Sequence, residues 1–192
     1  ILKELAQQGI LVCVAAGNDG GTVSWPAQED YVFAVTALTR QKTLASFSNR
    51  GAAADVAGYG VEIRSLGRGG AYAVLSGTSM SSPYIAGYIA AWASFRLSTG
   101  KSFPTFNETM EWLGKTSIDL GAPGRDWEFG LGLPNSETGF QDTPTSPPPP
   151  TAPPIVVPPI DASVTTPSGQ PVSIVITMPS GNQYVYKDGK PI

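Results

Sequence analysis

The most restrictive feature of this sequence is the run ILVCVAA at residues 10–16, which is apolar throughout and rich in β-branched residues. Such a run is typical of a strand buried on both faces in a parallel sheet. The preceding residues place Leu2, Leu5 and Ala6 on one helical face, and Gly9 suits the position after a helix end. A helix that leads directly into a buried strand is half of a βαβ repeat, so the sequence predicts an α/β fold with a parallel sheet.

Further strand and helix patterns follow along the chain. Three more apolar runs predict strands or turns, at residues 31–38, 54–63 and 71–77. After Ser79, apolar residues recur at helical spacing, with alanines and a glycine between them: Ile85, Ile89, Trp92 and Ala93. Because this helix is apolar nearly all round, we expect it to be buried. A third helix is predicted over residues 107–115.

Composition divides the chain into three parts. Residues 1–140 carry the α/β pattern, and residues 141–159 are so rich in proline that we expect a semi-rigid polyproline linker. Residues 160–192 hold two strand patterns, VSIVITM and YVYKDGK, around a PSGN turn, and predict a small, truncated β module. Because the chain opens at Ile1 inside a helical pattern, we expect it to be a fragment whose upstream half is missing.

Charge and apolar run length exclude two classes of partner. The net charge is −3 and the pI is about 4.9, so bulk electrostatics do not attract nucleic acid or an anionic membrane. No apolar run reaches the length of a transmembrane helix. The single cysteine, Cys13, cannot form an internal disulfide, and we expect it to be a buried small hydrophobe.

Ser79 stands where the predicted buried helix begins, directly after Gly77 and Thr78. A serine hydroxyl needs a base to become a nucleophile, and the free N–H groups of a helix N-terminus would stabilise an oxyanion beside it. A simpler alternative is that Thr78 or Ser79 only caps the helix. Two known serine motifs do not fit: G-x-S-x-G fails at Ser81, and S-x-x-K fails at Ser82.

Asn18 follows the buried strand in the segment VAAGNDG. Ligands of parallel α/β sheets bind at the carboxyl edge of the strands, and an asparagine amide at that edge is a neutral N–H donor. The alternative is an ordinary Asn-Asp-Gly turn.

Taken together, VCVAAGNDG, SFSNRG and SGTSMSSPYIAG, in this order and spacing, resemble the subtilisin-like serine proteases. The resemblance extends from the first helix to FGLGLPN at residues 129–135. It implies a three-layer α/β/α sandwich with a mainly parallel sheet that is incomplete at its N-terminus. It also implies a secreted serine endopeptidase that acts on polypeptides and requires no cofactor.

The resemblance assigns roles to individual residues. Ser79 would be the acylating nucleophile, and Asn18 would donate to the oxyanion together with the Ser79 backbone N–H. The substrate side-chain pocket would be formed by Ala15, Ala16, Gly17 and Ser24. A cis peptide bond is implied between Trp25 and Pro26. Some relatives bind structural calcium, and the aligned positions are Asp30, Val32 and Asp55.

The sequence departs from the family pattern at two positions, since Tyr84 replaces the usual histidine of the nucleophile helix and Ser81 replaces an alanine. The replaced histidine is structural and is not the base. Asp19 places a negative charge at the pocket rim, which predicts slower cleavage after acidic side chains than after basic or neutral ones. Equal rates on lysine and glutamate substrates would contradict this prediction.

The chain contains no histidine, although a nucleophilic serine of this type needs one as its base. The family places its aspartate and histidine upstream of the asparagine strand, so we expect the base to lie outside this chain and the isolated fragment to be inactive. The upstream half of the catalytic domain is therefore an expected partner. Two alternatives remain: an inactive pseudoenzyme, and a secreted binding or adhesion domain whose tail has an unknown partner.

Overall fold

The computed structural model describes residues 1–140, 173–177, 183–187 and 190–191. The chain divides into two compact units, Ile1–Pro150 and Thr151–Ile192. The predicted proline-rich linker, residues 141–159, lies outside the described residues. No helix in the described part of the chain combines the length and apolarity needed to cross a membrane.

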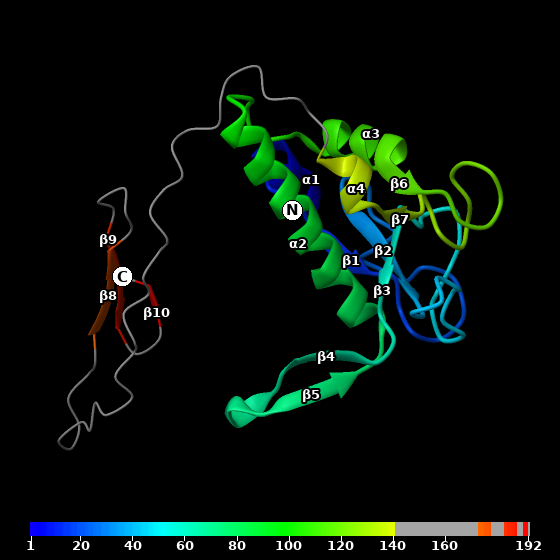
Figure 1. Ribbon diagram of the computed structural model, residues 1–192, viewed down its shortest axis with the longest axis horizontal. Helices are drawn as coiled ribbons and strands as arrows, with labels where there is room; N and C mark the ends of the chain where they lie inside the picture. The colour runs from blue at the N-terminus through cyan, green and yellow to red at the C-terminus, as the bar shows by residue number, and fades with distance from the viewer. Residues whose placement is uncertain (141–172, 178–182, 188–189, 192) are drawn as a thin grey trace. The chain divides into compact units, whose positions relative to one another are not determined.

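The first unit is built on a parallel sheet, as the sequence predicts (Figure 1). Helix α1 (Leu2–Gln7) leads through Gly9, with φ of 79°, into strand β1 (Cys13–Ala15). Strand β1 pairs in parallel with β2 (Phe33–Leu38), which pairs in parallel with β3 (Val56–Tyr59). Of these three strands, only β2 is buried at every residue, because it has a neighbouring strand on each side and packed residues on both faces.

The expected double burial of the first strand is wrong for the described residues. Strand β1 lies at the edge of the three-stranded sheet, and all three of its residues are only half-buried. Cys13, which we expected to be buried, is also only half-buried. Its burial still raises the pKa of the thiol to about 12, so the thiol stays protonated.

Two helices cover one face of the sheet. Helix α2 (Thr78–Ser98) contacts all three parallel strands, and α3 (Phe106–Thr116) packs beside it. The rings of Trp92 and Trp112 stack with centroids 4.1 Å apart and join the two helices. The shared core is formed by apolar residues of the sheet and both helices: Phe33, Val35, Val56, Ile85, Ile89, Trp92, Trp112 and Leu113.

The expectation that α2 is buried all round is also wrong. Its buried residues occupy one side: Thr78, Ser81, Ile85, Ile89, Trp92 and Ala93. The small residues between them are exposed: Ala86, Gly87, Ala90 and Ala91. Apolar spacing shows that a helix has an apolar surface, but it does not show how much of that surface is covered in the chain at hand.

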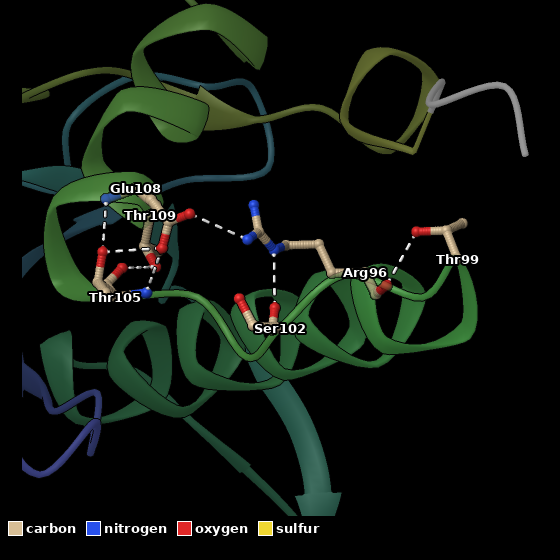
Figure 2. Close-up of polar contacts among 6 residues, drawn as sticks. All are labelled: Arg96, Thr99, Ser102, Thr105, Glu108 and Thr109. Carbon is tan, nitrogen blue, oxygen red and sulfur yellow. Dashed lines mark hydrogen bonds and ion pairs between the residues drawn. The ribbon is translucent and has the colours of Figure 1, made fainter. Parts of the chain in front are cut away.

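Polar contacts join the end of α2 to the start of α3 (Figure 2). Thr105 and Glu108 form a capping box at the first turn of α3, and Arg96 of α2 pairs with Glu108 at 3.0 Å. The Thr105 backbone N–H and hydroxyl, and then the Arg96 guanidinium, hold the pKa of Glu108 below its ordinary value. The capping box and the Arg96 contacts with Glu108 and with the Ser102 carbonyl, at 3.2 Å, thus add polar contacts to the stacked tryptophans that join the two helices.

Loops cover the opposite face of the sheet. Val23 and Ala27 pack against Ala34, and Phe129 and Leu133 pack against Leu38. The loop that carries Phe129 is anchored by the short antiparallel pair β6 (Ser117–Ile118) and β7 (Leu133–Pro134), followed by helix α4 (Ser136–Gly139).

A two-stranded antiparallel hairpin precedes α2. It consists of β4 (Ile63–Leu66) and β5 (Tyr72–Leu75), joined through the short 3-10 turn η1 (Arg68–Gly70). Figure 1 shows this hairpin extending away from the parallel sheet.

The second unit contains the two strands predicted in the tail. Strand β8 (Ser173–Thr177) pairs in antiparallel fashion with β9 (Gln183–Lys187), with Val175 opposite Val185. A short third strand, β10 (Lys190–Pro191), pairs with β9 and was not predicted. The predicted PSGN turn lies outside the described residues.

Candidate active site

The fold brings Asn18 and Ser79 to the same edge of the sheet. Asn18 follows the carboxyl end of β1, and Ser79 is the second residue of α2. The Ser82 hydroxyl donates to the Cys13 carbonyl at 3.1 Å and holds the first turn of α2 against β1. Both Asn18 and Ser79 are exposed, so a substrate can reach them.

Thr78 fixes the orientation of the Asn18 side chain. The Asn18 Oδ1 atom accepts from the Thr78 backbone N–H at 2.8 Å and from the Thr78 hydroxyl at 3.0 Å. The same hydroxyl accepts from the Gly17 N–H at 3.2 Å, and Thr78 is completely buried. Because both lone pairs of Oδ1 are used, the Asn18 amide turns its Nδ2 away from Thr78.

Gly77 marks the place where two donors come together. Its φ of 155° belongs to a backbone region that glycine adopts far more readily than other residues. A Cβ placed on Gly77 would lie 3.6 Å from the Asn18 Oδ1, 3.7 Å from the Asn18 Nδ2 and 3.7 Å from the Ser79 backbone nitrogen. The side-chain amide of Asn18 and the backbone nitrogen of Ser79 therefore lie close to one point beside Gly77.

The predicted pocket residues lie around the carboxyl end of β1. Gly17 leaves no room for a side chain, since a Cβ there would meet Asn49 and Ser24. The Ser24 N–H donates to the Ala16 carbonyl at 2.8 Å, which brings residue 24 beside the end of β1. The structure thus brings Ala15, Ala16, Gly17 and Ser24 together next to Asn18.

Three other sequence predictions concern the surroundings of the pocket. The Trp25–Pro26 peptide bond is cis, as predicted. Tyr84 is 40% exposed on α2 and packs edge-to-face against Tyr59 at 5.7 Å, and burial followed by the nearby Tyr59 raises its pKa. Asp19 is exposed, and its predicted effect on substrate choice stays a prediction.

The three predicted metal ligands line one cavity of about 420 Å³, together with Arg125. Asp55 is 8% exposed; its Oδ2 accepts from the Ala34 N–H at 2.9 Å, and its Oδ1 accepts from Arg125 at 2.8 Å. Arg125 also donates to the Ala54 carbonyl at 3.1 Å. Burial raises the Asp55 pKa, against the lowering effects of the Ala34 N–H and Arg125. A guanidinium therefore already faces the Asp55 carboxylate, and Asp30 and Val32 lie beside it.

Sequence reasoning missed three residues of this region: Thr78 as the partner of Asn18, Asn49 beside Gly17, and Arg125 beside Asp55. Thr78 stood inside a recognised motif, but only as a cap. The other two contacts join residues 32 and 70 positions apart, and no periodicity in the sequence reports such pairs.

Comparison with known proteins identifies a family for this chain. The sequence profile of the subtilase family matches residues 2–132. Subtilisin-like protease 7 of Arthroderma gypseum is 45% identical over 51% of this chain, and Minor extracellular protease Epr of Bacillus subtilis is 36% identical over 66%. The chain spans 24% and 19% of the lengths of these two relatives.

A solved structure gives the same result. The Prenylagaramide maturation protease PagA superimposes with a TM-score of 0.64 at 25% identity, over 72% of this chain and 52% of that chain. The profile match and the solved protease structure agree with the parallel α/β sheet described above. This chain belongs to the subtilase family.

Proposed function

We propose that the complete protein is a serine endopeptidase that forms an acyl-enzyme on Ser79. Ser79 Oγ attacks the peptide carbonyl carbon while a histidine takes its proton, and the carbonyl oxygen becomes an oxyanion. The Ser79 N–H and the Asn18 Nδ2 donate to that oxygen. The protonated amine then leaves, and a water molecule hydrolyses the ester.

One observation carries this proposal: both acceptor positions of the Asn18 amide are engaged by Thr78, at 2.8 Å and 3.0 Å. An asparagine that merely closed a turn would have no need of a second, buried residue to orient its amide. A donor fixed before the substrate binds needs no reorganisation when charge develops, which is how an oxyanion hole accelerates a reaction.

The base and its orienting carboxylate are proposed to lie upstream of this chain in the complete protein. The chain itself contains no histidine, so it should not hydrolyse peptides at an enzymatic rate when isolated. The upstream half of the catalytic domain is thus a necessary partner, and polypeptides are the substrates. Secretion is proposed by analogy with a relative whose name describes it as extracellular.

The experiment that tests this proposal is active-site labelling of the complete protein. A fluorophosphonate phosphorylates a serine only when a base activates it, so we expect one adduct, located at Ser79 by peptide mass spectrometry. Ser79→Ala should remove the adduct, and Ser76→Ala, which changes a neighbouring serine, should keep it. An unlabelled but folded protein would favour the pseudoenzyme or binding-domain alternative.

The family resemblance also implies a calcium ion at Asp30, Val32 and Asp55, and this site is a question separate from catalysis. The Asp55 carboxylate suits calcium, but the residues fit the ion only if Arg125 moves away, because its guanidinium already bonds Asp55 at 2.8 Å. We therefore propose that Arg125 supplies the positive charge that calcium would otherwise supply there.

This proposal predicts that calcium and a chelator leave the melting temperature of the parent protein unchanged. Arg125→Gln should lower stability by about 1–2 kcal/mol, since it leaves a largely buried carboxylate unpaired while the arginine itself is partly exposed. Added calcium should restore the melting temperature of this variant alone. Lys115→Gln, which breaks an exposed ion pair with Glu111, is the control and should change little. A calcium-stabilised parent would contradict the role given to Arg125.

A further inference from the structure

Asn49 is a buried polar side chain that the proposed mechanism does not use. It belongs to the segment SFSNRG, and it is 1% exposed. A buried amide costs free energy unless its donors and acceptors find partners. The hydrogen-bond partners of the Asn49 side chain lie in the loop that carries Asn18 and Ser24.

Three hydrogen bonds of the side chain connect Asn49 to that loop. Its Oδ1 accepts from the backbone N–H groups of Asp19 at 2.9 Å and Gly21 at 3.1 Å. Its Nδ2 donates to the Ser24 Oγ at 3.0 Å. Because Oδ1 faces two N–H donors, the amide orientation is determined, and Nδ2 must face Ser24.

The backbone of Asn49 holds the other end of the same loop. Its N–H donates to the Gly17 carbonyl at 2.9 Å. The residues on both sides of Asn18 are therefore bonded to Asn49, Gly17 through its carbonyl and Asp19 through its N–H. The side chain of Asn18 is thus fixed by Thr78, and its backbone is fixed by Asn49.

We infer that Asn49 is a positioning residue that couples the oxyanion donor Asn18 to the pocket residue Ser24. This inference rests on the proposed function. Asn49 touches neither the substrate nor the reacting atoms, and it acts by holding the main chain around Asn18 and the hydroxyl of Ser24 at a fixed separation. Gly17 lies against Asn49 and Ser24, and it has no side chain that could take over this role.

The test is a double-mutant cycle on the complete protein with a peptide substrate. Asn49→Ala should lower kcat by between about tenfold and a hundredfold, the range expected when a catalytic group is displaced by about an ångström. In an Asn18→Ala background the same change should have little further effect on kcat, because the donor that Asn49 positions is already absent. Equal losses in both backgrounds would overturn the inference.

Two variants separate positioning from general structural support. Thr109→Val removes a fully buried hydroxyl of α3 that donates to the Thr105 carbonyl at 2.8 Å and has no hydrogen bond to Asn49 or to the Asn18 loop. It should leave kcat unchanged. Asn49→Asp keeps an oxygen that can accept from the Asp19 and Gly21 N–H groups, and Ser24 can donate to the second oxygen. The added negative charge lowers turnover by itself, but the donor Asn18 stays positioned, so this variant should keep a higher kcat than Asn18→Ala even if Asn49→Ala does not fold. A folded Asn49→Asp variant whose kcat falls as far as that of Asn18→Ala would overturn the inference.

The kcat values of Asn18→Ala and Asn49→Ala also separate a failure of the Asn49 inference from a failure of the proposed function. If Asn18→Ala itself leaves kcat unchanged, the proposed oxyanion hole is wrong and the role of Asn49 falls with it. If Asn18→Ala lowers kcat and Asn49→Ala does not, the proposed function stands and only the role of Asn49 is wrong.

Discussion

Asn18→Ala is expected to lower the kcat of the complete protein by about a hundredfold or more and to leave KM nearly unchanged. The magnitude is already known for the corresponding asparagine of a subtilisin and is carried over to this chain, not newly estimated. The physical reason is that, in the proposed mechanism, the Asn18 Nδ2 donates to the oxyanion of the transition state and not to the neutral carbonyl of the bound substrate. Removal of such a donor affects the transition state and not the bound substrate.

Steady-state kinetics with a peptide substrate measures this effect. Asn18→Asp, which keeps the shape but replaces the donor with an oxygen, should be at least as slow as Asn18→Ala, because a carboxylate repels the oxyanion. Asn107→Ala alters an exposed asparagine in the first turn of α3 and serves as the control. A raised KM with normal kcat would mean that Asn18 binds the ground state instead.

The strands and helices were predictable from the sequence because their signals are local. The apolar run of residues 31–38 yielded β2, and the helical spacing after Ser79 yielded α2. The degree of burial was not predictable to the same extent. Burial depends on which neighbours are present, and strand β1 and the alanine-rich side of α2 lack them among the described residues. Alanine and glycine add little apolar area when exposed, so a helix side made of them can be either buried or exposed at little cost in free energy.

The candidate site divides in the same way. Asn18 and Ser79 were found because each stands at the end of a recognisable element and because a family motif surrounds both. Thr78, Asn49 and Arg125 were not found because their roles consist of single contacts across the fold. A contact such as that between the Arg125 guanidinium and the Asp55 carboxylate requires the loop of residues 120–133 to close on β3, and no pattern within either segment specifies the closure.

That closure depends on Gly130, and Gly130→Ala is expected to destabilise the protein by about 2–4 kcal/mol. Gly130 has φ of 58°, a conformation that costs a residue with a Cβ about 1 kcal/mol. In addition, a Cβ on Gly130 would collide with the backbone of Asp55 and Val56, and relieving such an overlap costs typically about 1–3 kcal/mol. Backbone atoms of β3 cannot turn aside as a flexible side chain does, so the loop must move instead.

Gly124→Ala is the matched control, because Gly124 has φ of 81° in the same loop but would place its Cβ in open space. It should lose only the backbone contribution of about 1 kcal/mol. The two variants are compared by thermal unfolding in a Ser79→Ala background, where self-cleavage cannot interfere. Each kcal/mol of lost stability should lower the melting temperature by about 2–4 °C. Equal shifts for the two glycines would show that the Asp55 backbone yields to the added methyl. In that case the close approach at Gly130 would not fix the loop, which would be held by the backbone hydrogen bonds from Leu131 to Asp55 and from Ala57 to Gly132.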